Sequence, residues 1–243
     1  MEKLDEYFDS VIKTLNAIKT DERETMETAA DLIYESLSAG GFLYTFGTGH
    51  GHMLAEELFY RAGGLVRVKA ILETDLMLHI SASKSTSYER DASLALNIFE
   101  KYNPQKGDVL IIASNSGRNE LPVEFAVLAA ERGIKTICIT NLNHSKGTTA
   151  RHKSGKKLFQ VCDLVIDNHG VKGDACIKVG QTNVSPTSTV TGAAILQAII
   201  AQTVSISQKN NNELEVYTSS NVEGGDEKNE IYLQKYCGKI ISL

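Results

Sequence analysis

The stretch DVLIIASNSGRN, residues 108–119, joins a nearly continuous apolar run to a polar loop that contains a glycine. Residues 108–113 lack Gly and Pro and are rich in β-branched side chains, which is typical of a strand buried on both faces. A helix is predicted to begin near Leu121, so the loop lies between a strand and a helix. Such a unit is typical of a parallel sheet that helices cover on both sides.

The same succession of elements is predicted along most of the chain. Apolar runs predict further strands at residues 42–46, 65–72, 135–140 and 161–167. Apolar periodicity, or the absence of Gly and Pro, predicts helices at residues 4–18, 25–37, 52–62, 91–102, 121–132 and 189–205. We therefore predict an α/β fold, a three-layer sandwich with a five-stranded parallel sheet.

Composition limits the classes of function. The 243 residues are 42% hydrophobic and 23% charged, which suffices for one domain core without metal or disulfide support. The net charge of −5 gives no general attraction to nucleic acid or to an anionic membrane. The basic cluster at 153–157 is interpreted as a solvated loop. The four cysteines lack Cys-x-x-Cys spacing, which disfavours disulfides and structural zinc.

Two segments are predicted. Residues 1–208 form the domain with its N-terminal helices, and residues 209–243 form a flexible extension whose last residues are open to docking as a short helix. The first residues lack the apolar stretch of a secretory signal and contain acidic residues that disfavour a mitochondrial presequence, so we expect a cytoplasmic protein. The apolar region 193–204 is too short to cross a bilayer and is predicted to be a buried helix.

The loop after residue 113 has the composition of an anion-binding nest. Small residues let backbone N–H groups approach an anion, serine hydroxyls add donors, and the following helix adds partial positive charge. A phosphate monoester suits this loop, although an ordinary turn with capping residues has a similar composition. The predicted phosphate-binding residues are Ser114, Asn115, Ser116, Gly117, Arg118 and Asn119.

A second loop between a strand and a helix, GTGHGH, occupies residues 47–52. The dinucleotide pattern G-x-G-x-x-G requires a glycine where this chain has His52, which weakens that alternative. The two-residue spacing of His50 and His52 is not the metal-binding spacing of a helix, so no metal site is predicted. Ligands of open parallel sheets bind at the carboxyl ends of the strands, where both loops lie. The further candidate binding residues are Gly47, Thr48, Gly49 and His50.

Two carboxylates are candidates for chemistry. Glu57 and Arg61 are four residues apart on a predicted helix, so they share a face, and a surface ion pair is the simpler interpretation of the spacing alone. Glu89 follows the polar segment 83–87, which we expect to be a loop beside the ligand edge of the sheet. Its carboxylate is equally suited to acid or base work and to capping the next helix.

The start of the last predicted helix, PTST at residues 186–189, offers a further contact. Hydroxyls and exposed N–H groups at a helix N-terminus favour an anionic or hydroxyl-rich group. Thr187 and Ser188 are therefore candidate binding residues, with simple helix capping as the alternative.

Taken in order, these motifs resemble the sugar isomerase (SIS) domain family over residues 29–204. FGTG at 46–49 resembles its first phosphosugar loop, SNSGRN its Ser-rich phosphate loop, and PTST the start of its closing helix. AEELFYR at 55–61 is similar to the helix of phosphoheptose isomerases that carries a catalytic glutamate and an arginine. Glu57 and Arg61 stand at those two positions.

The resemblance implies a flavodoxin-like sheet, no organic cofactor, a phosphosugar ligand, and active sites formed between subunits of a homodimer or homotetramer. The resemblance does not settle the reaction, for which aldose–ketose isomerisation is our leading expectation. Glu57 would then be the base, Glu89 or His52 its acid partner, and Arg61 the group that stabilises the enediolate. Each proton transfer contributes about 10²- to 10⁴-fold to the rate.

The reaction itself stays open at this stage. Phosphoheptose isomerases place a catalytic histidine on the closing helix, whereas residues 171–243 contain no histidine. The chain is also similar to acetylmuramic acid 6-phosphate etherases, in which two glutamates catalyse an elimination, and Glu57 and Glu89 fit those roles. Phosphosugar sensing, as in transcription regulators with this domain, is a third possibility, although no basic recognition helix is visible.

Overall fold

The computed structural model describes residues 2–243 and has five parallel strands at its centre. The strands are β1 (Leu43–Gly47), β2 (Val68–Ala70), β3 (Val109–Ala113), β4 (Lys135–Thr140) and β5 (Leu164–Asp167). Their order in the sheet is β2-β1-β3-β4-β5, and every neighbouring pair is parallel. This is the flavodoxin-like order, so the predicted fold class is confirmed.

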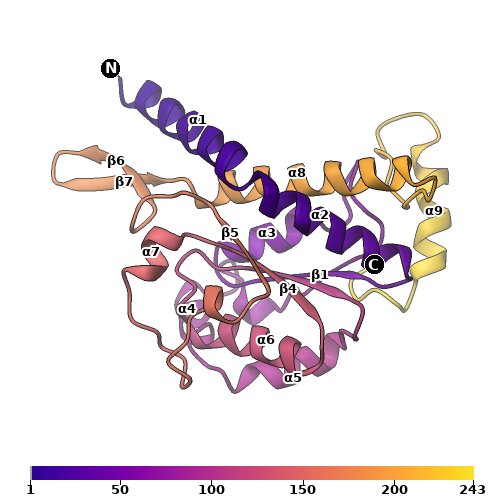
Figure 1. Ribbon diagram of the computed structural model, residues 1–243, viewed down its shortest axis with the longest axis horizontal. Coiled ribbons are helices and arrows are strands. Elements are labelled where there is room, and N and C mark those ends of the chain that lie inside the picture. The colour runs from indigo at the N-terminus through magenta and orange to yellow at the C-terminus, as the bar shows by residue number, and fades with distance from the viewer. Residues whose placement is uncertain (1) are drawn as a thin grey trace.

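Helices cover both faces of the sheet, as Figure 1 shows. One layer contains α1 (Lys3–Asp21), α2 (Arg23–Ser38), α3 (Gly51–Glu57) and α8 (Ser188–Lys209), and the other contains α5 (Leu94–Tyr102) and α6 (Glu120–Glu131). Successive strand residues point to opposite faces. On β3, Ile111 therefore packs in the core beneath α2 and α8, whereas Leu110 and Ile112 pack in the core beneath α5 and α6.

The helix and the strand that follow β1 are both shorter than the sequence predicts. The predicted helix 52–62 ends at Glu57, and Tyr60 adopts a left-handed φ of 45°. The predicted strand 65–72 pairs within the sheet only over Val68–Ala70. The reason is a contact distant in sequence, because Leu65 forms an antiparallel bridge with Val216 from the C-terminal segment.

The polar segment 83–87 is a helix and not the predicted loop. It belongs to α4 (Ala82–Tyr88), which follows the 3₁₀ turn η1 (Thr74–Leu76). The Ser81 side chain caps α4 by accepting from the backbone N–H of Lys84. Ser85 is buried and donates to the carbonyl of Leu76 at 2.7 Å, so a serine-rich sequence forms one buried side of a short helix.

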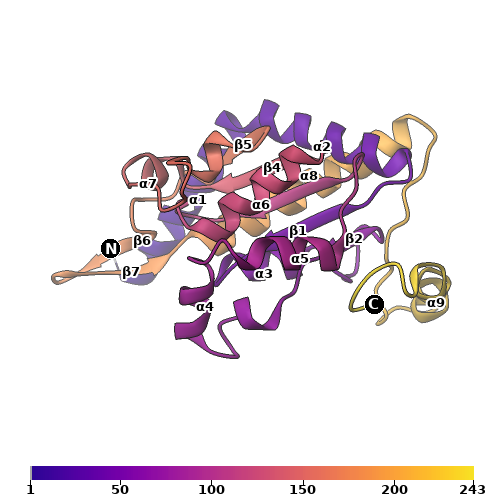
Figure 2. The same cartoon turned by 90° about the horizontal axis from the view of Figure 1, so that it is seen from below.

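The region between β4 and α8 contains elements that the sequence did not reveal. These are α7 (Leu142–Lys146), η2 (Leu158–Gln160) and an antiparallel hairpin of β6 (Ala175–Val179) and β7 (Thr182–Pro186). The hairpin projects from one end of the molecule beside α1, and the phenol of Tyr7 donates to the carbonyl of Pro186 at 3.1 Å. Figure 2 shows α9 (Gly225–Tyr236) at the opposite end.

Residues 209–243 follow a defined path, which differs from the predicted flexibility. The N–H of Gly63 donates to Tyr217 and the N–H of Tyr217 donates to Gly64, both at 2.9 Å. The buried Asn229 of α9 makes two bonds to the backbone of Thr218, at 3.0 and 2.7 Å. The extension is therefore part of the folded unit.

Helix α8 is longer than the apolar region 193–204 suggested. Its 22 residues meet the length and composition of a membrane span, and it is the one helix within residues 2–243 that does so. One side of α8, including Ile195 and Ile199, is buried against the core that α2 also covers. The structure thus uses it as a core helix, as predicted, with its other side exposed.

Candidate active site

A cavity of about 400 Å³ opens at the carboxyl ends of β1, β3, β4 and β5. That volume lies within the range of small-molecule sites. We call it the cleft. Nine of the predicted site residues line it: Thr48, Gly49, His50, Glu89, Ser114, Asn115, Ser116, Asn119 and Ser188. The structure thus brings both predicted loops, and the start of the closing helix, to one place.

The first loop turns very tightly from β1 into α3. A Cβ on Gly47 would lie 2.2 Å from the carbonyl oxygen of Gly51, which no side chain tolerates. Gly47 therefore shapes the turn without lining the cleft, and the turn presents Thr48, Gly49 and His50 to it.

The second loop, Ser114–Asn119, is held by residues that follow the neighbouring strands β4 and β5. The backbone N–H of Asn141 donates to the carbonyl of Asn115, and the side chain of Asn168 donates to the side chain of Asn115 at 2.8 Å. The N–H of Gly117 donates to the hydroxyl oxygen of Ser114 at 3.3 Å, which leaves the Ser114 hydroxyl hydrogen free to donate elsewhere. The arrangement keeps the loop in a fixed shape.

Helix α6 begins at the cleft with its N-terminus uncapped by any side chain of its N-cap residue, Asn119. The first N–H groups of a helix carry partial positive charge and bind anions. Gly117 and Arg118 do not line the cleft. Gly117 is packed with a φ of 57° close to Thr140 and Ser145, and Arg118 donates to Thr149 at 2.9 Å.

Of the predicted catalytic residues, Glu89 is the one that lines the cleft in the single chain. It is the C-cap residue of α4, and the Thr48 hydroxyl donates to its Oε2 at 3.0 Å. Burial raises the pKa of the Glu89 carboxyl, and the hydrogen bond from Thr48 and the charges of Arg90 and Arg151 oppose that rise only in part. A carboxyl group with a raised pKa is suited to general acid or base work.

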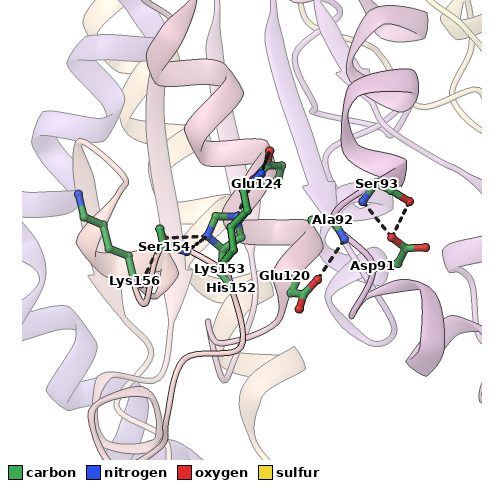
Figure 3. Close-up of polar contacts among 9 residues, drawn as sticks. All are labelled: Asp91, Ala92, Ser93, Glu120, Glu124, His152, Lys153, Ser154 and Lys156. Atoms are coloured by element: carbon green, nitrogen blue, oxygen red, sulfur yellow. Dashed lines mark hydrogen bonds and ion pairs between the residues drawn. The ribbon is translucent and has the colours of Figure 1, made fainter.

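Figure 3 shows two carboxylates of α6, Glu120 and Glu124, in contact with residues outside that helix. Glu120 accepts from the backbone N–H of Ala92 at 3.4 Å, on the segment that follows Glu89. Glu124 pairs with the buried His152 at 2.5 Å, next to Arg151 in the chain. Arg151 in turn donates to the side-chain oxygen of Asn119. Contacts outside the cleft therefore hold Asn119 and the segment after Glu89 in place.

The N-terminus of α8 is already occupied by an internal carboxylate. Asp174 accepts from the N–H of Thr187 at 3.1 Å, from the N–H of Ser188 at 3.0 Å, and from the Ser188 hydroxyl. Thr187 is buried and does not line the cleft, whereas Ser188 and Asp174 do. The anionic contact that the sequence suggested here is made within the protein itself.

The remaining catalytic candidates lie outside the cleft of the single chain. His52 is 3% exposed, and burial lowers the pKa of its imidazole. Glu57 forms an ion pair with Arg61, and Gln197 of α8 donates to its carboxylate at 3.0 Å. The structure therefore separates Glu57 and Arg61 from Glu89.

Several cleft residues were missed by sequence reasoning. Asn168 and His144 follow β5 and β4, and the rule that ligands gather at the carboxyl ends of strands points to them as well. Ser85 and Thr86 belong to α4, which the polar composition concealed. Asp174 lies in a loop with a left-handed φ of 70° and carried no recognisable motif.

Residues 2–243 contain no group of three or more His, Cys, Asp or Glu side chains arranged to hold a metal ion. The titratable side chains that line the cleft are Glu89, Asp174, His50 and His144.

Comparison with known proteins identifies the family. The SIS domain family model matches residues 6–141, more than half of the chain. A UPF0309 protein of Geobacillus thermodenitrificans is 42% identical over 239 residues, which cover 98% of this chain and 96% of that protein.

Solved structures share the fold at low sequence identity. The phosphoheptose isomerase of Neisseria gonorrhoeae superposes with a TM-score of 0.55 at 18% identity, over 84% of this chain and 97% of that one. The sugar isomerase domain of an RpiR transcription factor from Sphaerobacter thermophilus gives a TM-score of 0.52 at 16% identity, over 95% of both chains. The chain belongs to the SIS domain family and, within it, to the UPF0309 proteins.

Proposed function

We propose that the protein is a sugar-phosphate isomerase that holds the phosphate of its substrate on the loop Ser114–Asn119 and at the N-terminus of α6. The observation that carries the proposal is the position of Glu89, a half-buried carboxyl group in the same cleft as this loop. A phosphate fixed at one end of the cleft leaves the carbonyl end of a sugar beside Glu89.

In aldose–ketose isomerisation, a base removes the proton from the carbon next to the carbonyl group and an acid protonates the carbonyl oxygen. The base then returns its proton to the former carbonyl carbon of the enediol, while the other enediol hydroxyl gives its proton to the conjugate base of the acid and becomes the new carbonyl. Glu89 serves as one of these two groups. The Thr48 hydroxyl, which donates to Glu89, orients the carboxylate for the transfer.

Glu57 supplies the second carboxylate across a subunit interface in this proposal. Within one chain it lies beside α8, whose exposed side carries Ala194, Ala198 and Ala201. Small side chains permit a second chain to approach closely, and α8 is otherwise apolar over most of its length. A homo-oligomer formed there would bring Glu57 and Arg61 of one chain toward the cleft of its partner.

The test is an assay of the purified protein with phosphorylated aldoses, ketoses and amino sugars, followed by NMR to detect interconversion. Conversion of an aldose phosphate to its ketose supports the proposal. Binding without conversion of any member favours the alternative of a phosphosugar sensor, for which the separation of Glu57 from Glu89 in the single chain is the supporting observation. The panel should also contain a phosphosugar that carries an ether substituent. Release of that substituent would support the alternative of a phosphosugar etherase.

A further inference from the structure

We infer that the cleft selects sugars that carry one phosphate and no second acidic group, because Asp174 fills the second anion position of the cleft. The inference rests on the phosphosugar binding proposed above and specifies the class of sugar that the same site takes. It does not depend on the reaction that follows.

Asp174 is placed as a bound anion would be. Its two carboxylate oxygens accept from two backbone N–H groups and one hydroxyl at the start of α8, at Thr187 and Ser188. These donors and the helix dipole are the features that attract an external anion to a helix N-terminus. Because Asp174 takes these donors of Thr187 and Ser188, a second phosphate or a carboxylate of the ligand meets a carboxylate there in place of them.

The charged side chains that line the cleft also disfavour a second acidic group on the ligand. In the single chain, Asp174 and Glu89 both line the cleft, and none of the lysines and arginines within residues 2–243 lines it. Arg118 and Arg151 lie near the phosphate loop but donate to Thr149 and Asn119. Away from that loop, a ligand therefore meets carboxylate acceptors, which bind hydroxyl or amine donors and repel a second anion.

His144 also lines the cleft, and its ring accepts from the backbone N–H of Gly173, the residue before Asp174, at 2.8 Å. Burial and the neighbouring cations Lys172 and Arg118 lower the pKa of its imidazole, although Asp174 opposes this. A lowered pKa makes this imidazole less able than a free histidine to carry a positive charge that would offset Asp174.

The substitution Asp174→Asn removes the negative charge of the side chain and keeps its size and shape. Asn tolerates the left-handed φ of 70° that this position has, and its side-chain oxygen still accepts from Thr187 and Ser188. Asp226→Asn on α9, an exposed position far along the chain from the cleft, removes the same charge elsewhere and serves as the control.

The experiment is a calorimetric titration with two matched ligand pairs. Sorbitol 6-phosphate and 6-phosphogluconate differ only in a hydroxymethyl group or a carboxylate at C1, and fructose 6-phosphate and fructose 1,6-bisphosphate differ by one phosphate. The native chain should bind the first member of each pair at least about tenfold more tightly, as expected for repulsion between nearby charges. Asp174→Asn should reduce this preference to within about threefold by strengthening the binding of the acidic members, and Asp226→Asn should leave it unchanged.

Equal affinities within both pairs in the native chain, while the monophosphates bind, would overturn this inference and leave the proposed function standing. An undiminished preference in folded Asp174→Asn would overturn the role of Asp174. Failure of every phosphosugar to bind the native chain would overturn the proposed function and this inference with it.

Discussion

At the scale of single residues, Glu89 links the geometry of the cleft to its chemistry. Its backbone carbonyl accepts from the N–H of Leu121 at 3.1 Å, and its side chain accepts from Thr48. Glu89 is therefore held by its backbone at the start of α6 and by its carboxylate at the first loop. A group fixed on both sides can transfer a proton without first ordering itself, which lowers the entropic cost of the reaction step.

Glu89→Gln should abolish turnover while it preserves phosphosugar binding. Gln retains the shape and the acceptor for Thr48 but cannot exchange a proton, so kcat should fall at least about 10²-fold with little change in KM. Steady-state kinetics and calorimetry on the same variant provide the check. Native turnover in Glu89→Gln would remove Glu89 from the mechanism.

The raised pKa of Glu89 also predicts a pH-dependent stability difference. The folded protein keeps this carboxyl protonated to a higher pH than the unfolded chain does, so the free energy of unfolding falls as pH rises through that interval. Glu89→Gln removes this dependence. Denaturant unfolding should therefore find the variant more stable than the native chain at pH 7 and the difference smaller near pH 4; the opposite trend with pH would contradict the assigned shift.

At the scale of secondary-structure elements, the sequence predicted best those parts that depend on local composition. The apolar runs of β3 and β4 appear where they were expected, and so do the two loops at the carboxyl ends of β1 and β3. A strand buried on both faces needs little information beyond its own residues. The alternation of strands and helices was then sufficient to predict the sandwich.

The missed elements depend on contacts that are distant in sequence. Helix α4 is rich in serine, and its stability comes from a cap and from the burial of Ser85, which composition does not reveal. The C-terminal segment looks flexible because its backbone partners, Gly63 and Gly64, lie about 150 residues earlier in the chain. Asp174 likewise gains its role only from the position of α8.

Asn229→Ala tests whether the C-terminal extension is part of the folded unit. The change leaves the N–H and carbonyl of Thr218 without their partner, which should cost about 1–3 kcal/mol of unfolding free energy. Chemical denaturation measures the cost, and Asn221→Ala in the exposed turn before α9 is the matched control. Equal stability of the two variants, together with rapid proteolysis of residues 209–224 in the native chain, would show that the extension is loose.

At the scale of the whole molecule, exposed apolar surfaces support the proposal that the chain self-associates. Leu4, Phe8 and Ile12 recur every four residues on α1 and are each more than half exposed. One side of α8 is also uncovered in the single chain. Exposed apolar surfaces of this kind mark sites of protein association, and we propose that a second copy of the chain covers them.

Ala198→Glu should dissociate the proposed oligomer, because it places a charge on the exposed side of α8 where a second chain would pack. Sedimentation should show a shift toward the monomer, with phosphosugar binding weakened less than turnover. A native chain that is monomeric at micromolar concentration would refute the shared site.

Mixing two inactive variants tests the shared site more specifically. A hybrid of a Glu57→Gln chain and a Glu89→Gln chain contains one cleft with both carboxylates intact, so subunit exchange should restore part of the activity. The restored activity should appear on mixing and be absent from either variant alone. If mixing restores nothing although the subunits exchange, Glu57 and Glu89 do not act across an interface.

The most direct test of the account concerns the phosphate itself, because every later step requires its capture by the loop Ser114–Asn119. Thermal unfolding should be measured with a panel of phosphosugars, with the corresponding free sugars, and with nicotinamide dinucleotides. At about a hundredfold excess over its dissociation constant, a phosphosugar should stabilise the folded protein by about 2.7 kcal/mol, and the free sugar should not. Equal stabilisation by phosphorylated and free sugars, or stabilisation by the dinucleotides alone, would contradict the account.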